Sequence, residues 1–278
     1  MSSTNAVHPT AIVDSGATLG NGVKIGPFCH VGPEVVLGDG VELVSHVVVA
    51  GATTIGDQTR VFPHATLGTP PQNVRHKGGR TTLSIGRNCL IRECVTMNTG
   101  TDTSRGATTV GDGGMFMAYT HVAHDCIVGN NVTFANSATL AGHCEVGDNV
   151  IIGGLTAVHQ FVRIGHHAFV GGCSAIVGDV IPYGMAEGNK ARLRGFNIIG
   201  MKRSGFARAD LAVMRQAYQV IFDQRHPLVE NLERAAAEFS GSGTVIDMIN
   251  FMRSRGKRYF TVPPHGEALF DDDAGQDG

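Results

Sequence analysis

Aliphatic side chains, with a few Met and Phe, recur every six residues along the first two thirds of the chain. The runs extend from Val7 to Leu67, from Ile85 to Met97 and from Val110 to Ile176. An α-helix repeats every 3.6 residues and a strand every two, so neither produces this spacing. A six-residue repeat is typical of a parallel β-helix, here of about ten coils. In such a solenoid we expect function on the surface, in inserted loops or between copies.

The repeat also predicts the shape of each coil. Small or apolar residues such as Ala17, Val23 and Cys29 lie two positions before a repeat residue, so both side chains point inward. Glycines such as Gly20 and Gly26 often follow it, and we expect them to permit a tight corner. Three repeats, each a short strand and a corner, make one coil. Residue n therefore stacks on residue n+18, at a spacing of about 4.8 Å.

Two segments interrupt the repeat. The stretch GTPPQNVRHKGGRTTLS is rich in Pro and Gly, and the repeat keeps its phase across it. It predicts an inserted loop at residues 68–84. A second excursion at residues 98–106 shifts the phase by one position. Long loops in a compact scaffold are often functional.

The repeat ends at Pro182, and from about Phe196 the spacing becomes helical. Pro227 suits the first turn of a helix that runs to about Phe239, and Thr244 is placed to cap a last helix through Arg253.

The chain is therefore expected to be mainly β, with a parallel β-helix at 1–187, a helical domain at 188–262 and a disordered acidic tail at 263–278.

Charge and cysteine content limit the possible partners. The chain has a net charge of −2, yet residues 188–260 carry 13 Lys and Arg against 6 Asp and Glu. This excess favours an anionic partner, such as phosphates or an acidic protein. Nucleic acid is not expected, because no aromatic stacking pattern accompanies the charge. The six cysteines show no paired metal spacing, and no segment resembles a membrane span or a leader, so we expect a cytoplasmic protein without integral membrane contact.

Histidines cluster on three successive coils. His121 and His124 lie in THVAHDC, and His143 follows Asp125 by one full coil. The stacking rule therefore places two imidazoles and a carboxylate on one corner. A carboxylate orients a histidine and increases its basicity, which makes His124 a candidate general base. The alternative is a zinc site like that of the γ-class carbonic anhydrases, for which the repeat positions no obvious third ligand.

Several motifs then carry a family resemblance. The segments HPTAIV, IRECVTMNTGT, THVAHD, NSATLAGH, IIGGLTAVHQF, VGGCSAIVGDV and FNIIGMKRSGF resemble, in order and spacing, the UDP-N-acetylglucosamine O-acyltransferases of lipid A biosynthesis. The resemblance extends from His8 to about Arg253. It implies a homotrimer of left-handed β-helices with active sites between subunits. It also implies transfer of an R-3-hydroxyacyl group from acyl carrier protein to the 3-hydroxyl of UDP-N-acetylglucosamine, without metal or cofactor.

The resemblance assigns roles residue by residue. It makes His124 the catalytic base and Asp125 its supporting neighbour, with the backbone N–H of Gly142 as donor to the oxyanion. The positions matching substrate contacts are His121, His143, His159 and Gln160 around the base, Gln72, Asn73 and Arg75 on the Pro-rich loop, and Asn197 and Arg203 beyond the repeat. Gly172 matches the position that limits acyl length, where glycine leaves room for a chain of about twelve carbons or more.

Some residues depart from the family pattern. Asn73 replaces a common acid, Ile199 a common glutamate and Asn98 a frequent histidine. These changes leave open an alternative acceptor, a 3-amino sugar nucleotide that would yield an amide. The related N-acyltransferase of the same pathway carries a uridine-binding domain before the solenoid, and a repeat that begins at Val7 leaves no room for one. An inert structural solenoid would not explain why Asp125 stacks under His143.

The sequence also suggests how partners bind. Phe134, Phe161 and Phe169 are expected on the outer faces of the coils, where a trimer would cover them. The basic helical domain is expected to recruit the acidic acyl carrier protein, with Arg253, Arg255 and Arg258 as docking residues.

Overall fold

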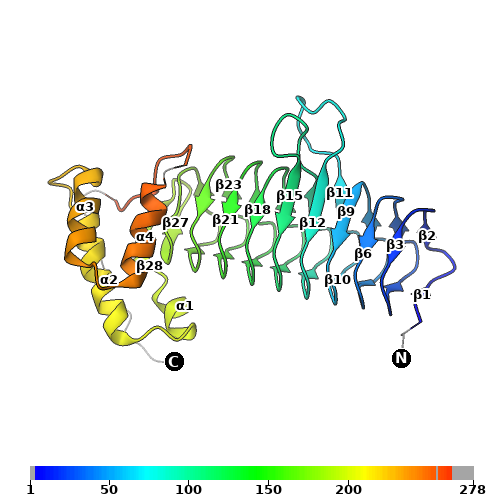
Figure 1. The fold of residues 1–278 in the computed structure, drawn as a ribbon, viewed down its shortest axis with the longest axis horizontal. Helices are drawn as coiled ribbons and strands as arrows, with labels where there is room; N and C mark the ends of the chain where they lie inside the picture. The colour runs from blue at the N-terminus through cyan, green and yellow to red at the C-terminus, as the bar shows by residue number, and fades with distance from the viewer. Residues whose placement is uncertain (1–3, 255, 265–278) are drawn as a thin grey trace.

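The structure is a computed structural model that describes residues 4–254 and 256–264. Its first part is a long left-handed β-helix in which three parallel sheets form the faces of a prism (Figure 1). The acidic tail lies outside the described residues from 265 onward. No helix among the described residues is long and apolar enough to span a membrane.

The sheets contain the strands in steps of three along the chain. The first, eleven-stranded sheet comprises β1 (Ala6–Val7), β4 (Lys24–Ile25), β7 (Glu42–Leu43), β10 (Arg60–Val61), β13 (Leu90–Ile91), β16 (Met115–Phe116), β19 (Thr133–Phe134), β22 (Ile151–Ile152), β25 (Phe169–Val170), β27 (Gly184–Glu187) and β28 (Arg192–Phe196). The nine-stranded sheet comprises β2 (Ile12–Val13), β5 (His30–Val31), β8 (Val48–Val49), β11 (Thr66–Thr69), β14 (Thr96–Asn98), β17 (His121–Val122), β20 (Thr139–Leu140), β23 (Ala157–Val158) and β26 (Ala175–Ile176). The eight-stranded sheet comprises β3 (Thr18–Leu19), β6 (Val36–Leu37), β9 (Ala52–Ile55), β12 (Thr82–Ile85), β15 (Ala107–Val110), β18 (Ile127–Val128), β21 (Glu145–Val146) and β24 (Arg163–Ile164).

The six-residue repeat forms the core of this prism. Ile25, Leu43 and Phe116, each the second residue of its strand, are at most 2% exposed. Register follows the expected stacking of residue n on residue n+18, with Ala6 opposite Lys24. Phe134 is also fully buried and meets Phe116 edge-on inside the prism, so its expected position on an outer face was wrong. It occupies a repeat position, and repeat positions point inward.

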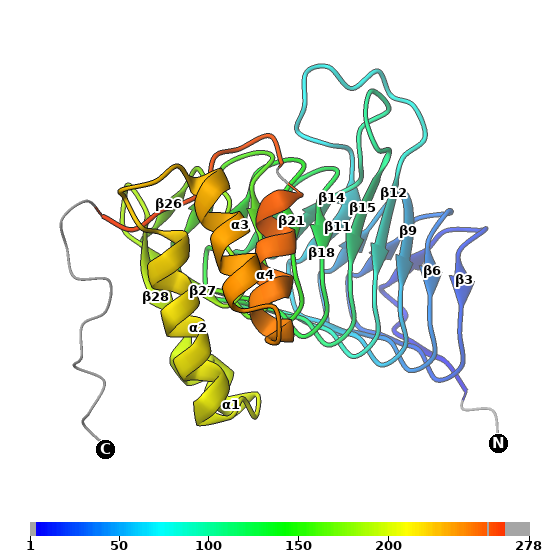
Figure 2. The same ribbon diagram turned by 60° about the vertical axis from the view of Figure 1, so that its left-hand side comes forward.

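Two loops leave the prism between neighbouring coils (Figure 2). The first loop, residues 70–81, joins β11 to β12, and the second loop, residues 99–106, joins β14 to β15. On one side Arg60 pairs with Glu42, 18 residues earlier in the sequence, which is the regular length of a coil. On the other side it pairs with Leu90, 30 residues later, because the first loop is inserted between them. Leu90 in turn pairs with Met115, so the second loop lengthens the next coil by a smaller amount.

The corners differ from the expectation about glycine. Gly20 and Gly56 do not adopt positive φ, whereas corner residues such as Tyr119 do. A side chain on Gly20 would instead lie 2.7 Å from the backbone nitrogen of Asp39 in the next coil, and one on Gly56 2.6 Å from the carbonyl carbon of Gly86. Glycine after the repeat residue therefore allows coils to pack closely, rather than supplying the turn.

One corner of the prism carries a ladder of carboxylate and amide side chains that the repeat did not predict. Each accepts the backbone N–H of the corner residue one coil earlier, as Asp57 accepts from Asp39 at 2.8 Å and Asp148 from Asn130 at 2.6 Å. We call these residues the corner ladder: Asp39, Asp57, Asp112, Asn130 and Asp148. The ladder satisfies N–H groups that point along the solenoid axis.

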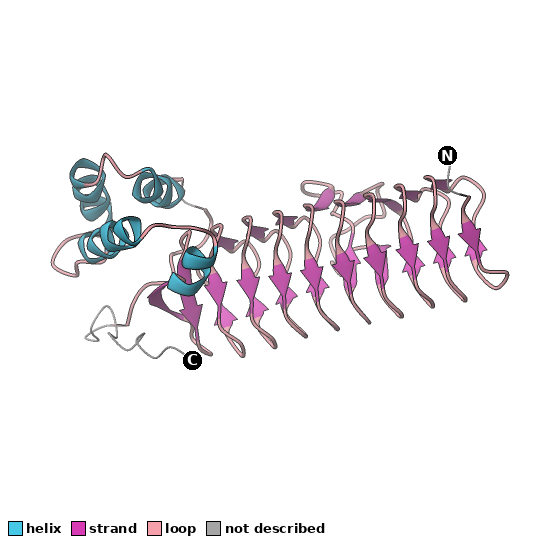
Figure 3. Ribbon diagram, turned by 90° about the horizontal axis from the view of Figure 1, so that it is seen from below, coloured by secondary structure: helices cyan, strands magenta, loops and turns pink. Residues whose placement is uncertain are grey.

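The last coils end in a hairpin and four helices (Figure 3). The strand β28 pairs antiparallel with β27, so sheet structure continues past the boundary expected at residue 188. The helices are α1 (Ile198–Arg203), α2 (Arg208–Ile221), α3 (Leu228–Glu238) and α4 (Gly243–Arg253). They form their own core around Met214, Tyr218 and Ile249.

Two helix starts differ from the sequence prediction. Pro227 precedes α3 as its N-cap rather than opening the first turn. Ser242, not Thr244, caps α4 and accepts the N–H of Val245. Serine and threonine are both good cap formers, so the sequence alone did not distinguish these two positions.

Candidate active site

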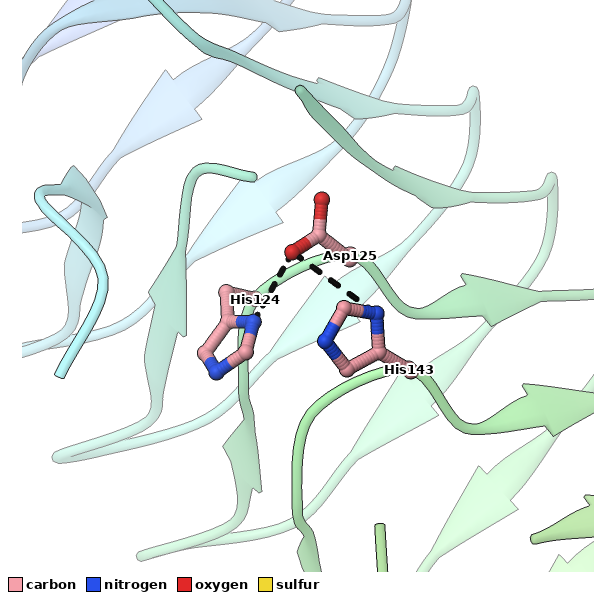
Figure 4. A group of neighbouring side chains, drawn as sticks. All are labelled: His124, Asp125 and His143. Carbon is pink, nitrogen blue, oxygen red and sulfur yellow. Dashed lines mark hydrogen bonds and ion pairs between the residues drawn. The ribbon is translucent and has the colours of Figure 1, made fainter. Parts of the chain in front are cut away.

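His124 and Asp125 lie at the corner after β17 (Figure 4). Their contact joins His124 Nδ1 to Asp125 Oδ2 at 2.9 Å, and the two side chains are 11% and 0% exposed. Because a carboxylate accepts, Nδ1 carries the proton and Nε2 keeps its lone pair. The pair thus has the form of an oriented general base.

The carboxylate of Asp125 is held by the second loop as well as by His124. It accepts the backbone N–H of Thr101 at 3.1 Å, the Thr101 hydroxyl at 2.7 Å and the N–H of Gly106 at 3.1 Å. Burial alone would raise the pKa of Asp125, but the hydrogen bonds from Thr101 and His124 lower it below its usual value. The Asp125 carboxylate is therefore held as an anion in the folded protein.

Two more imidazoles line the same region and favour the neutral form. His143 stacks on the ring of Phe161 and meets His124 edge-on, with its Nδ1 3.9 Å from Asp125. Burial lowers the pKa of His143, although Asp125 acts in the opposite direction. Burial also lowers the pKa of His121, whose Nδ1 lies 2.7 Å from the Thr96 hydroxyl, and the nearby His124 adds to this shift. Neutral imidazoles leave His124 as the base supported by a carboxylate.

Gly142 lies directly against the ring of His124. A side chain there would come within 2.7 Å of His124 Nε2, so only glycine leaves that nitrogen accessible. Among the described residues, the Gly142 N–H donates to no protein acceptor, while its carbonyl accepts from Phe161. A free N–H beside the base can serve an oxyanion.

The first loop reaches the base through Asn73. Its amide nitrogen Nδ2 lies 3.2 Å from His124 Nε2, on the side opposite Asp125. The Asn73 oxygen accepts the N–H of Arg75 within the loop, where Gln72 and Arg75 are both exposed. The structure therefore brings together His124, Asp125, Gly142, His143 and Asn73.

Other expected site residues lie one or more coils further along. Arg258 donates to the carbonyl of Gln160 at 2.9 Å and contacts His159 Nδ1 at 2.6 Å. Beside it, Lys257 Nζ lies 4.2 Å from the centre of the Phe161 ring. Arg258 therefore contacts two of the expected site residues, and its expected docking role stays a prediction. Gly172 is exposed at a corner, where a side chain would lie 3.2 Å from the carbonyl of Gly154.

The nucleotide-sugar residues expected beyond the repeat are not joined to this group within one chain. Asn197 caps α1, accepting from Gly200 N–H and donating to the carbonyl of His167. Arg203 is exposed at the end of α1. No hydrogen bond or ion pair of the described residues connects either to His124.

The sequence did not single out Thr101 or Gly106, and it marked Asn98 only as a departure from the family pattern. Asn98 donates to the carbonyl of Pro70 at 3.1 Å and to the Thr69 hydroxyl at 3.0 Å, and so fixes the base of the first loop. The available signal was the phase shift at 98–106, which marked the segment but not its contacts.

The group His124, Asp125 and His143 has ligand atoms within 4.8 Å of one another, so we tested it as a metal site. Its spacing fits hydrogen bonding better, because His124 and Asp125 are 2.9 Å apart and the carboxylate accepts from Thr101 and Gly106. A zinc ion would have to replace these bonds at about 2.0–2.2 Å from each ligand.

The chain matches two protein-family descriptions. Residues 16–51 match the bacterial transferase hexapeptide family (six repeats), and residues 179–260 match UDP N-acetylglucosamine O-acyltransferase, domain 2. The second match covers the hairpin and the helices.

Curated relatives and solved structures agree. An acyl-acyl-carrier-protein–UDP-N-acetylglucosamine O-acyltransferase from Mesorhizobium japonicum is 63% identical, over 93% of this chain and 92% of its own length. One with the same name from Brucella ovis is 51% identical, over 96% and 98%.

The structure titled LpxA from Acinetobacter baumannii superposes with a TM-score of 0.89 at 39% identity, covering 92% of this chain and 99% of that one. A UDP-N-acetylglucosamine acyltransferase from Campylobacter jejuni gives 0.87 at 38% identity, covering 93% and 100%. The O-acyltransferase names do not favour the amide-forming or zinc-binding alternatives. The chain belongs to the UDP-N-acetylglucosamine O-acyltransferase family.

Proposed function

We propose that this protein transfers an R-3-hydroxyacyl group from acyl carrier protein to the 3-hydroxyl of UDP-N-acetylglucosamine, the first step of lipid A biosynthesis. The observation that carries the proposal is the base itself. His124 has one nitrogen on the buried carboxylate of Asp125, and its other nitrogen lies beside Gly142 and 3.2 Å from the amide of Asn73. The relatives named for this reaction are similar over nearly the whole chain.

The geometry supports a single acyl transfer. His124 Nε2 takes the proton of the sugar hydroxyl as the oxygen attacks the thioester carbonyl. The imidazolium that forms is stabilised by Asp125. The N–H of Gly142 donates to the tetrahedral oxyanion. When the intermediate collapses, the carbon–sulfur bond breaks and the carrier thiolate takes the proton back from His124. Acyl ester and free carrier thiol are the products.

The proposal is tested by mass spectrometry of the products. Purified protein is incubated with a panel of 3-hydroxyacyl carrier proteins and with UDP-N-acetylglucosamine or its 3-amino analogue. With UDP-N-acetylglucosamine as acceptor, we expect a product heavier than the substrate by one 3-hydroxyacyl group. The proposal is contradicted if only the 3-amino analogue is acylated, or if no combination of carrier protein and nucleotide sugar gives an acylated product.

We further propose that the site is shared between subunits of a homotrimer. Asn197 and Arg203 lie at the helical end of the chain, away from the bonded group around His124, and a second copy would supply them. One row of stacked corner residues also carries large exposed apolar side chains, with Phe28 at 59%, Tyr119 at 65% and Leu155 at 67%. Sedimentation as an active monomer would exclude this arrangement.

We place the reaction in the cytoplasm, where acyl carrier protein is available. The cysteines of the core support a reducing compartment, because Cys29, Cys89, Cys126 and Cys144 are free and buried. Fractionation of expressing cells, with activity measured in each fraction, tests the assignment.

A further inference from the structure

Asp102 is an acidic residue on the second loop that the proposed chemistry does not use. Its carboxylate accepts the backbone N–H of Lys77 at 3.0 Å and that of Gly79 at 2.8 Å. The ring of His76 also approaches it, with Nδ1 3.2 Å from Oδ1. All three partners belong to the first loop, so Asp102 joins the two loops away from their base, where the Thr81 hydroxyl also donates to that of Thr99 at 2.9 Å.

Asp102 is the main attachment of the first loop beyond its base. The loop is almost devoid of apolar side chains that could anchor it, and Val74 is fully exposed. Thr81 bonds Thr99 at the base of the loop, and beyond the base the other side-chain attachments among the described residues are the amide of Asn73 on His124 and the ion pair of Arg80 with Glu34. That ion pair is largely exposed and contributes little. The bonds to Asp102 are charge-assisted and involve backbone, so they fix the path of the chain.

The position of Asp102 is in turn set by the catalytic carboxylate. Its neighbour Thr101 donates both its N–H and its hydroxyl to Asp125. A continuous circuit therefore runs from His124 through Asp125 and Thr101 to Asp102, across to the first loop, and back through Asn73 to His124. This series of contacts begins at Nδ1 of His124 and returns to Nε2 of the same ring.

The two loops also meet closely in space. A side chain on Gly79 would bring its Cβ to 2.7 Å from the Cβ of Asp102. Glycine at this position therefore allows the carboxylate to reach the N–H groups. The fit at Gly79 is independent of the hydrogen bonds and points to the same contact.

We propose that Asp102 is a positioning residue that locks the first loop over the catalytic base. By holding residues 77–79 it seats Asn73 on His124 Nε2, and the amide donor keeps that nitrogen an acceptor until the sugar hydroxyl replaces it. The same lock presents Gln72 and Arg75 to the nucleotide sugar. Its effect on catalysis rests on the proposed function, whereas its effect on the loop does not.

The first test measures the loop alone. Amide hydrogen exchange of peptides covering residues 70–81 is compared in the full-length protein and in Asp102→Asn. Loss of the carboxylate leaves one acceptor oxygen for two N–H donors, so we expect exchange in this loop about tenfold faster or more. The matched control is Asp112→Asn, since Asp112 also accepts a backbone N–H, that of Arg87 at 2.8 Å, but on the corner ladder. The control leaves exchange at 70–81 unchanged.

The second test measures steady-state kinetics of the same proteins. Asp102→Asn raises the KM for the nucleotide sugar about tenfold, with a smaller change in kcat and no change in the KM for acyl carrier protein. Asp102→Glu restores part of the loss, because it keeps the charge. An unchanged sugar KM together with unchanged exchange overturns the lock, as does an equal effect of Asp112→Asn.

Gly79→Ala supplies a second variant that keeps the carboxylate but separates the two loops. It should reproduce the faster exchange and the higher sugar KM, and wild-type values for both contradict the proposal. A wild-type protein that forms no acyl sugar would refute the proposed function, while the exchange comparison would still decide whether Asp102 holds the loop.

Discussion

Asp112 and Asp125 are both carboxylates at corners of the same solenoid, yet their surroundings differ. Asp112 belongs to the corner ladder, where its side chain is 44% exposed and pairs with the N–H and guanidinium of Arg87. Asp125 is fully buried and accepts from Thr101, Gly106 and His124. The difference arises from the second loop, which covers one corner and leaves the other in water. A repeated corner thus becomes the proposed catalytic corner when an insertion supplies donors and excludes solvent.

The comparison predicts the largest effect at the base. His124→Ala removes the group that accepts the hydroxyl proton, so kcat should fall roughly 10²–10⁴-fold. His46→Ala is the matched control, because His46 is also a corner histidine but stacks between Phe28 and His64 in the first coils. Steady-state assays and thermal unfolding of both variants check the prediction. Near-normal turnover by His124→Ala would remove the proposed mechanism.

Asp125→Asn should give the next largest effect. The amide offers one acceptor oxygen, and its NH2 group would face the N–H donors of Thr101 or Gly106. We expect the free energy of unfolding to fall by about 1–3 kcal/mol and kcat to fall on the order of a hundredfold, because His124 loses its orientation as well.

Asp112→Asn should change the free energy of unfolding by no more than about 0.5 kcal/mol, since its carboxylate is exposed. Urea unfolding at fixed protein concentration measures both variants. Equal losses in the two would mean that burial by the loop does not distinguish the corners.

The contrast also shows how far the sequence could predict the molecule. The six-residue repeat located the core, the loops and the stacking of His143 on Asp125, because each follows from a coil of three repeats. It could not predict that Thr101 and Gly106 donate to Asp125, since these bonds depend on how a loop without periodicity folds back. Phe134 was misplaced outside the prism because its aromatic character was considered before its repeat position. The contact of Arg258 with His159 could not be predicted either, because the return of the C-terminal segment to the solenoid leaves no mark in the spacing.

Gly172 lies at a corner where the missing side chain is expected to leave room for a long acyl chain. Gly172→Met would extend over the exposed corner near Gly154, and we expect the preferred acyl chain to become shorter. Each methylene that loses its contact costs about 0.8 kcal/mol, so the ratio of kcat/KM between twelve and ten carbons should fall about tenfold. Competition assays with two acyl carrier proteins measure that ratio. If the wild type already prefers ten carbons, the half-buried Phe169 is the next residue to change.

The half-buried histidines His121 and His143 predict a pH dependence of stability. Burial lowers the pKa of His121 and His143 in the folded state, whereas unfolded histidines titrate near about 6.5. As the pH falls below that value, the unfolded chain binds more protons than the folded one. Stability is therefore complete above about pH 6.5 and is lost as the pH falls toward the lowered pKa values.

Urea unfolding between pH 5 and 7.5, at one protein concentration, measures this slope. His143→Gln should flatten it, because one of the groups no longer titrates. His46→Ala, which changes an exposed histidine, should leave the slope as it is. An identical slope in His143→Gln would contradict the assignment.

The smallest expected effect concerns the basic side chains of the helical end. Some of them are exposed to solvent, whereas others are already bound to protein groups. Within the basic helical end, Arg253 pairs with Glu233 at 2.8 Å and Arg258 is bound to His159 and Gln160, while Arg255 lies outside the described residues. Lys202 and Arg208 are exposed instead. The double variant Lys202→Ala, Arg208→Ala should raise the KM for acyl carrier protein severalfold at low salt and leave the sugar KM unchanged. Added salt should shrink the difference, because a Debye length of about 10 Å at 0.1 M screens exposed charges. A KM that stays at the wild-type value at low salt would move carrier docking away from this surface.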